Sequence, residues 1–114
     1  MNKKIIIVEG TTDKRKVKKI VRENVDIICT NGTISESRLE DLMDQIIEKD
    51  IYVLVDADKD GEKLRKLFIR SYPEVNHIYI DKSFREVATT PDHYLASVLL
   101  AANIDVHTFY LEKG

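Results

Sequence analysis

Cysteine, proline and tryptophan are scarce in this chain, and each shortage excludes a class of protein. The 114 residues include one Cys, two Pro, four Gly and no Trp. A single cysteine, Cys29, permits no internal disulfide, so we expect a reducing, cytoplasmic location. The low Pro and Gly content excludes collagen-like and low-complexity chains.

Long hydrophobic runs are absent as well. No apolar stretch approaches the roughly 20 residues that span a bilayer, so we expect no membrane association. The first apolar run, Ile5–Val8, is too short for the core of a signal peptide. With 43% hydrophobic and 33% charged residues, the composition is that of a globular protein. We expect a single domain over residues 1–114.

Neither sign of charge dominates, but the charges are unevenly distributed. The formal net charge of −2 gives no overall attraction to nucleic acid. Residues 13–23 contain six basic and two acidic side chains, whereas residues 35–50 contain two basic and six acidic ones. Two interpretations stay open: ordinary solvated helix faces, or a polarised binding surface.

Short β-branched runs alternate with amphipathic segments. The sequence predicts strands at Lys4–Val8, Val25–Cys29, Ile51–Val55 and His77–Ile80, with a short closing strand at Val106–Leu111. It predicts helices at Asp13–Glu23, from a capping box at Thr33–Glu36, from the acidic loop to Tyr72, and from Pro91. Tyr94 lies in the apolar stripe of the last helix, so we expect it in the core. Alternation of this kind predicts an α/β fold with three layers. We expect a mostly parallel sheet of four core strands in the order 2-1-3-4, with helices on both faces.

Carboxylates directly follow two of the predicted buried strands. The first strand is followed by Glu9-Gly10, and the third by the segment 56–62, Asp-Ala-Asp-Lys-Asp-Gly-Glu. Because neighbouring parallel strands end at one rim of a sheet, we expect Glu9, Asp56 and Asp58 to converge there. Gathered carboxylates repel one another unless a hard cation compensates, and oxygen ligands suit Mg²⁺ or Mn²⁺ better than zinc.

Two glycines accompany these acids. Gly10 follows Glu9, and Gly61 follows Asp60. We expect both to permit close backbone approach and unusual torsions beside the site.

Two other acidic patterns share part of this arrangement. An EF-hand loop beginning at Asp56 needs a bidentate Glu at its twelfth position, where this chain has Leu67. A phospho-acceptor receiver domain needs paired acids after the first strand, where this chain has Glu9 alone. The receiver remains a remote alternative, and the EF-hand fits less well still.

The order and spacing of these motifs resemble the Toprim family over about residues 3–82. That family has a strand ending in Glu-Gly, then a strand ending in Asp-x-Asp-x-Asp-Gly-Glu, as in segments 9–10 and 56–62 here. Glu9-Gly10-Thr11-Thr12-Asp13 and Gly61-Glu62-Lys63-Leu64-Arg65 further resemble motifs of Toprim nucleases, including the ribonuclease that matures 5S ribosomal RNA. The resemblance implies a Rossmann-like Toprim fold.

The resemblance also implies roles for the acids. Asp56 and Asp58 would be the main ligands of one or two Mg²⁺ or Mn²⁺ ions, weakly bound without substrate. Glu9 would be a general acid/base or a shared ligand, and Asp13 and Asp60 would support a second ion. An acid near a helix N-terminus, such as Asp13, is also favoured by the helix dipole alone.

Basic residues next to both motifs are candidates for phosphate or nucleic-acid contact, namely Lys14, Arg15, Lys63 and Arg65. The implied function is magnesium-dependent, nuclease-like hydrolysis of RNA or DNA. The alternative is a non-catalytic accessory module that binds nucleic acid or a ribonucleoprotein, with a protein partner as a further expectation. The sequence leaves the choice between RNA and DNA open.

Overall fold

Strands and helices alternate along the chain in the computed structural model, which describes residues 3–32 and 34–112. The elements are β1 (Lys4–Val8), α1 (Thr11–Ile20), β2 (Val25–Cys29), α2 (Glu36–Ile46), β3 (Asp50–Leu54), α3 (Lys59–Ser71), β4 (Asn76–Ile78), α4 (Asp92–Ala101) and the 3-10 helix η1 (Thr108–Leu111). None of the helices within these ranges is both long and apolar enough to cross a membrane.

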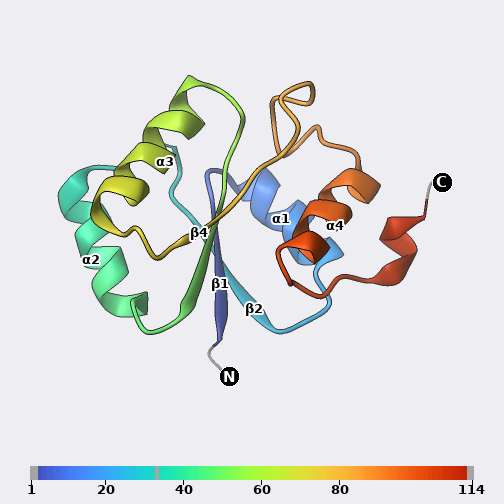
Figure 1. The fold of residues 1–114 in the computed structure, drawn as a ribbon, viewed down its shortest axis with the longest axis horizontal. Helices are drawn as coiled ribbons and strands as arrows, with labels where there is room; N and C mark the ends of the chain where they lie inside the picture. The colour runs from blue at the N-terminus through green and yellow to red at the C-terminus, as the bar shows by residue number, and fades with distance from the viewer. Residues whose placement is uncertain (1–2, 33, 113–114) are drawn as a thin grey trace.

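The sheet has four parallel strands in the order β2-β1-β3-β4, as predicted. Helices α1 and α4 cover one face, and α2 and α3 cover the other (Figure 1). Strand side chains alternate between the two faces: Ile6 and Val8 pack on the α1/α4 side, and Ile5 and Ile7 on the α2/α3 side. Burial of the central strands on both faces explains their uninterrupted apolar runs.

Several helix boundaries differ from the prediction: α1 begins at Thr11 rather than Asp13, and Pro91 is the N-cap of α4 rather than its first residue. Helix α1 ends at Ile20 rather than Glu23, because Val21 is extended and forms an isolated antiparallel bridge with Val106. Helix α2 is capped by Ser35, whose Oγ accepts a hydrogen bond from the main-chain N–H of Arg38 at 3.3 Å. Thr33, where the cap was predicted, lies outside the described residues.

Strand boundaries also shift where pairing partners end. Strand β3 begins and ends one residue before the predicted range, and its last pair joins Leu54 to Ile78. Strand β4 therefore ends at Ile78 rather than Ile80, since a longer strand would have no neighbour to pair with.

The predicted closing strand at 106–111 is wrong. Only Val106 pairs, and residues 108–111 form η1. Tyr110 and Leu111 pack against the core beneath α1 and α4, so apolar contact rather than strand pairing holds this segment.

Candidate functional site

Adjacent parallel strands bring Glu9 and Asp56 into direct contact. Glu9 follows β1 and Asp56 follows β3 by two residues, and the two strands pair in register. Glu9 Oε1 accepts a hydrogen bond from the main-chain N–H of Asp56 at 2.9 Å. The two acids therefore meet at the carboxyl-end rim of the sheet, where α/β folds bind their ligands.

The segment after β3 is also fixed by the β4–α4 loop (residues 79–91). Asp56 Oδ1 accepts a hydrogen bond from the main-chain N–H of Val87 at 2.8 Å. The N–H of Ala57 donates to the carbonyl oxygen of Arg85 at 2.6 Å. Sequence reasoning missed this loop, because main-chain donors and acceptors leave no signature in side-chain pattern.

Asp58 begins helix α3. Its Oδ1 accepts a hydrogen bond from the main-chain N–H of Gly61 at 2.8 Å, which makes Asp58 the N-cap. Asp60 lies in the first turn, is exposed, and does not contribute to the shifted pKa values of the other acids. The structure thus places Asp58 with the acidic group and leaves Asp60 outside it.

Asp13 joins the group from α1. It is 7% exposed, and its Oδ2 accepts a hydrogen bond from the main-chain N–H of Gly10 at 3.1 Å. This bond is an ordinary helix-start contact, but the burial of a carboxylate is not ordinary. Asp13 is therefore held within electrostatic reach of Asp56 and Glu9.

Burial and mutual repulsion raise the pKa of three acids in this group. For Glu9 the pKa is raised by burial first, then by the charges of Asp56, Asp58 and Asp13, against the opposing hydrogen bond from Asp56 N–H. Burial is also the largest cause of the raised pKa of Asp13 and of Asp56. Glu86, on the β4–α4 loop, repels both of these and was missed by sequence reasoning.

The donor set fits a hard divalent cation. Its side-chain donors are all oxygens, the ligands that Mg²⁺ and Mn²⁺ prefer. Within residues 3–32 and 34–112, none of the ion pairs involves Glu9, Asp13, Asp56 or Asp58. The same ranges contain no set of three or more His, Cys, Asp or Glu side chains close enough to hold a metal by themselves. Mg²⁺ typically binds through one or two carboxylates plus substrate phosphates.

The two glycines of the motifs differ in whether the structure leaves room for a side chain. At Gly61, an added Cβ would lie 2.0 Å from the carbonyl oxygen of Asp56, so close backbone approach requires glycine. At Gly10, an added Cβ would lie 3.5 Å from Asp13 Oδ2, an ordinary contact, and φ is −129°. The unusual torsions expected at both positions are wrong, since neither has a positive φ.

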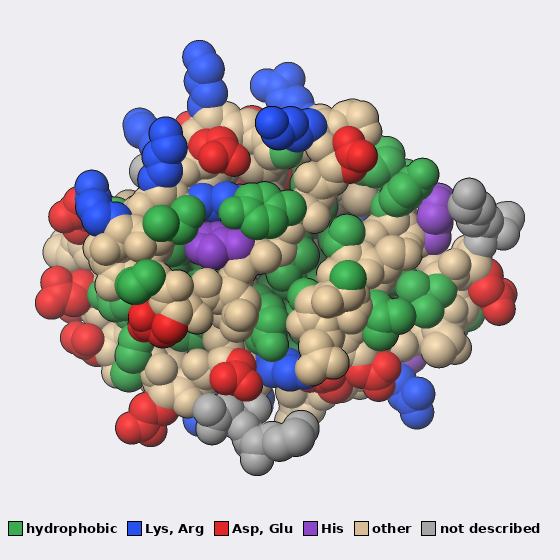
Figure 2. All heavy atoms as spheres, viewed as in Figure 1, with side chains coloured by type: hydrophobic (Ala, Val, Ile, Leu, Met, Phe, Trp, Pro, Cys, Tyr) green, Lys and Arg blue, Asp and Glu red, His purple; other side chains and the backbone are tan. Residues whose placement is uncertain are grey.

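A basic hollow adjoins the acids on the α3 side. This shallow pocket of about 440 Å³ is lined by Ala57, Asp58, Lys59, Glu62, Lys63, Lys66 and Lys82. Figure 2 shows Lys and Arg side chains standing out from the edge of the molecule at which the strands end (top of the view). Of the lining lysines the sequence pointed to Lys63, whereas Lys82 comes from the distant β4–α4 loop.

Arg65 is not placed to meet an approaching phosphate. It is 3% exposed, and its Nη2 donates to the carbonyl oxygen of Ile78 at 2.6 Å. Its guanidinium carbon lies 4.0 Å from the centre of the Tyr79 ring. The guanidinium joins α3 to the end of β4, so the structure does not support the predicted contact of Arg65 with phosphate.

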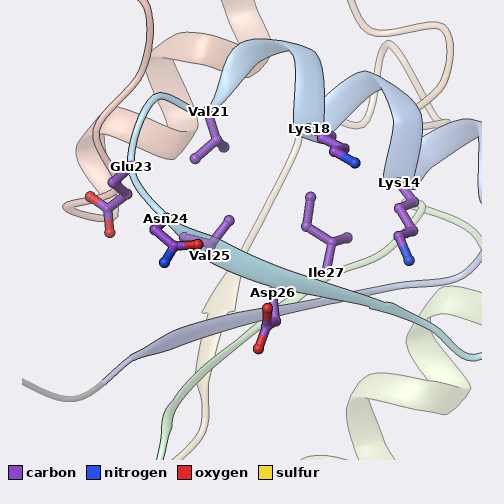
Figure 3. Close-up of a pocket in the computed structure, with 8 residues that line it drawn as sticks. All are labelled: Lys14, Lys18, Val21, Glu23, Asn24, Val25, Asp26 and Ile27. Carbon is purple, nitrogen blue, oxygen red and sulfur yellow. The ribbon is translucent and has the colours of Figure 1, made fainter.

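Lys14 lines a different hollow. A pocket of about 470 Å³ lies between α1 and the edge strand β2. In Figure 3, Lys14 and Lys18 project from α1, Val25 and Ile27 rise from β2 toward the helix, and Asp26 projects from the opposite face of the strand. Arg15 is exposed on α1. The structure therefore places Lys14 and Lys18 beside β2 rather than in the basic hollow on α3.

The fold and this rim define the chain as an α/β protein with carboxylates gathered at the ends of adjacent parallel strands. A model of the Toprim domain matches residues 4–83, and the chain belongs to the Toprim domain family. This assignment replaces the EF-hand and receiver alternatives. The resemblance inferred from the sequence is confirmed.

The relatives include small and long proteins. A solved small TOPRIM domain protein from Bacillus stearothermophilus is 52% identical, with a TM-score of 0.96, covering 100% of this chain and 97% of that one. The uncharacterized protein YusF of Bacillus subtilis is 53% identical over 110 residues, covering 96% of this chain and 75% of YusF.

Ribonuclease M5 of Staphylococcus aureus is 37% identical over 78 residues, 68% of this chain and 43% of that protein. Ribonuclease M5 1 of Ligilactobacillus salivarius strain UCC118 is 33% identical over 81 residues, 70% of this chain and 43% of that protein. The match thus spans less than half the length of these ribonucleases.

Proposed function

We propose that this protein acts on nucleic-acid phosphodiesters with the help of Mg²⁺ or Mn²⁺, and that its reaction is hydrolysis. The observation that supports this most is that carboxylates and lysines lie next to each other at one rim of the sheet. Uncompensated carboxylates from β1, α1 and the β3–α3 segment lie beside a hollow that contains four lysines. A metal ion screens the former while the latter attract a polyanion.

Asp56 and Asp58 would hold the ion, with Glu9 near enough to share it, and Asp13 would support a second one. A divalent ion bound there stabilises charge on the scissile phosphate. Glu9 is suited to proton transfer because its pKa is raised by burial and by Asp56. Within the described residues Glu9 accepts through Oε1 only, which leaves Oε2 to take or give a proton.

Lys59, Lys63, Lys66 and Lys82 would position the strand on the α3 side of the ion. The names of the Ribonuclease M5 relatives support RNA as the substrate class. Hydrogen-bonding of the acids to main-chain groups keeps their geometry fixed before substrate arrives.

A second function is favoured by a separate observation. Asp58 caps α3, Asp56 fixes the β4–α4 loop, and the chain spans 43% of the Ribonuclease M5 proteins named above. Each acid thus has a structural task that a non-catalytic protein also needs. In that case the protein is an accessory module that binds nucleic acid, or a ribonucleoprotein partner, without cleaving it.

A cleavage assay separates the two functions. Structured RNA, single-stranded DNA and duplex DNA are incubated with the protein and Mg²⁺ or Mn²⁺, beside the double variant Asp56→Ala/Asp58→Ala. The matched control is Asp60→Ala, because Asp60 belongs to the same motif but lies outside the acidic group. Cleavage that the double variant loses and the control retains supports the nuclease. Binding without cleavage supports the accessory module. If the protein neither binds nor cleaves any of these nucleic acids, both functions are contradicted.

A further inference from the structure

Arg85, on the β4–α4 loop, has a backbone conformation that favours glycine. Three non-glycine residues in the described part of the chain have positive φ: Asn31 at 59°, Arg85 at 62° and Asn103 at 67°. Asparagine tolerates this left-handed region, whereas arginine has no such tendency. Arg85 is therefore the position at which glycine or asparagine would suit the backbone better than the residue present.

The strained residue lies against the acidic site. Its carbonyl oxygen accepts a hydrogen bond from the N–H of Ala57 at 2.6 Å, and its own N–H donates to the carbonyl of Lys82 at 3.1 Å. Two residues later, the N–H of Val87 binds Asp56 Oδ1. The loop therefore places Arg85 directly beside the segment that connects Asp56 to Asp58. Strain that surrounding contacts maintain next to a site is a common functional signature.

The side chain of Arg85 forms no stabilising contact that would require an arginine within the described residues. Arg85 is exposed, and its guanidinium takes part in none of the ion pairs or side-chain hydrogen bonds found among the described residues. The backbone would accept glycine at lower cost. The guanidinium is what arginine adds, and its planar fork matches a phosphate group.

Arg85 follows an aromatic residue that packs against α4. The ring of Phe84, the preceding residue, lies 4.9 Å from the ring of Tyr94 at the start of α4. The Tyr94 ring lies 4.5 Å from that of His93. Tyr94 is 47% exposed, so its expected place in the core is wrong. Aromatic faces next to a phosphate-binding cation are the elements with which proteins stack unpaired bases.

We propose that Phe84, Arg85 and Tyr94 form a subsite for one unpaired nucleotide of the substrate. Arg85 binds its phosphate, and the Phe84–Tyr94 surface stacks its base. The proposal rests on the proposed action on nucleic acid and deepens it: the strand at the acidic site is single-stranded rather than paired. Bases in a duplex are already stacked and cannot reach such a surface.

Fluorescence anisotropy with a labelled 12-nucleotide RNA, single-stranded or paired, tests the subsite. Ca²⁺ replaces Mg²⁺ so that binding is measured apart from cleavage. Arg85→Gly should weaken single-strand binding about tenfold while leaving the melting temperature unchanged or higher. Arg85→Lys retains the charge but not the planar fork, and should recover only part of the affinity. Tyr94→Leu should weaken single-strand binding about tenfold and leave duplex binding unchanged.

Phe109→Leu is the matched control. Phe109 is 62% exposed on η1, and η1 follows His107, whose N–H binds the carbonyl of Ile20 at the far end of α1 from the acids. This variant should bind like the wild type. If wild-type protein binds neither RNA nor a single-stranded DNA of the same length, the proposed function itself fails. If it binds RNA, but Arg85→Gly and Tyr94→Leu bind equally well or Arg85→Gly melts at a lower temperature, the subsite is overturned while the proposed function stands.

Discussion

At Gly61 a side chain would collide with the backbone of the acidic site. An added Cβ would lie 2.0 Å from the carbonyl oxygen of Asp56 and 3.0 Å from its carbonyl carbon. Backbone atoms cannot rotate away as a flexible side chain can. Gly10 makes no such contact, although it belongs to the matching motif on β1.

Gly61→Ala is therefore expected to lower the free energy of unfolding by about 2 kcal/mol or more, by forcing α3 away from Asp56. Gly10→Ala should cost about 1 kcal/mol or less, the scale of a helix-cap substitution. Urea denaturation of both variants measures the difference. Equal losses would contradict the close approach of Gly61 to Asp56.

Repulsion among the acids predicts a pH dependence in metal-free protein. The pKa of Glu9, Asp13 and Asp56 is raised on folding, by burial first. Below their ordinary pKa values these groups are protonated in both states, so no penalty exists. As the pH rises through the raised pKa values, the folded state must ionise unfavourably and loses stability, and the penalty is complete above them.

Asp56→Asn removes one charge, and its amide oxygen can still accept from Val87 N–H. In EDTA we expect this variant to melt about 2–4 °C above wild type at pH 7, a modest gain because the group is partly solvated. The advantage should disappear at pH 3, below the ordinary Asp56 pKa of 3.8. Differential scanning calorimetry measures both, with Asp60→Asn as the control. A melting temperature at pH 7 equal to or below that of wild type would argue against repulsion.

At the scale of elements, Arg65 joins helix α3 to the end of β4. Besides its bond to Ile78, its Nη1 lies 3.1 Å from His77 Nδ1. A buried guanidinium with these partners cannot be replaced by a single ammonium, because several directions must be satisfied at once.

Arg65→Met should therefore cost about 2–3 kcal/mol of unfolding free energy, since it leaves the Ile78 carbonyl unpaired. Arg65→Lys should also be destabilising. The comparison variant is Lys63→Met, on the exposed side of the same helix, which should change stability by about 0.5 kcal/mol or less. Chemical denaturation tests the set. An Arg65→Met variant as stable as Lys63→Met would show that the α3–β4 tie contributes nothing.

Much of the fold and part of the site could be predicted from sequence, and the elements show why. The apolar runs of β1 and β3 indicate buried strands, and parallel topology then places Glu9 beside Asp56. The contribution of the β4–α4 loop could not be predicted, because Arg85 and Val87 act through main-chain groups. The apolar content of residues 106–111 suggests a strand, but only Val106 pairs and residues 108–111 form η1, since local pattern does not reveal which neighbours remain available for pairing.

At the scale of the whole molecule, opposite charges are separated within a nearly neutral protein. Acidic side chains lie over α2, at the left of Figure 2. On α1, Lys16 and Lys19 pair with Asp92 of α4, at 3.3 and 3.2 Å between nitrogen and oxygen. These cations are partly neutralised by α4, so the hollow with four lysines on the α3 side is the stronger candidate for attracting a polyanion.

Binding of single-stranded RNA should consequently weaken with salt. Four phosphate contacts predict a slope of about −3 in log K against log salt concentration. Lys63→Gln/Lys82→Gln should reduce that slope, whereas Lys16→Gln/Lys19→Gln should change it little. Anisotropy titrations in increasing KCl measure the slopes. Affinity independent of salt would contradict electrostatic binding at this hollow.

We propose that the carboxylates at the ends of β1 and β3 bind a divalent cation. An NMR titration of ¹⁵N-labelled protein with millimolar Mg²⁺ tests it most directly. Metal binding at this rim should shift the amides of Gly10, Asp56, Gly61 and Val87, and none of these shifts should occur in Asp56→Asn/Asp58→Asn. Unchanged spectra at these amides, or the same changes in the double variant, would contradict it.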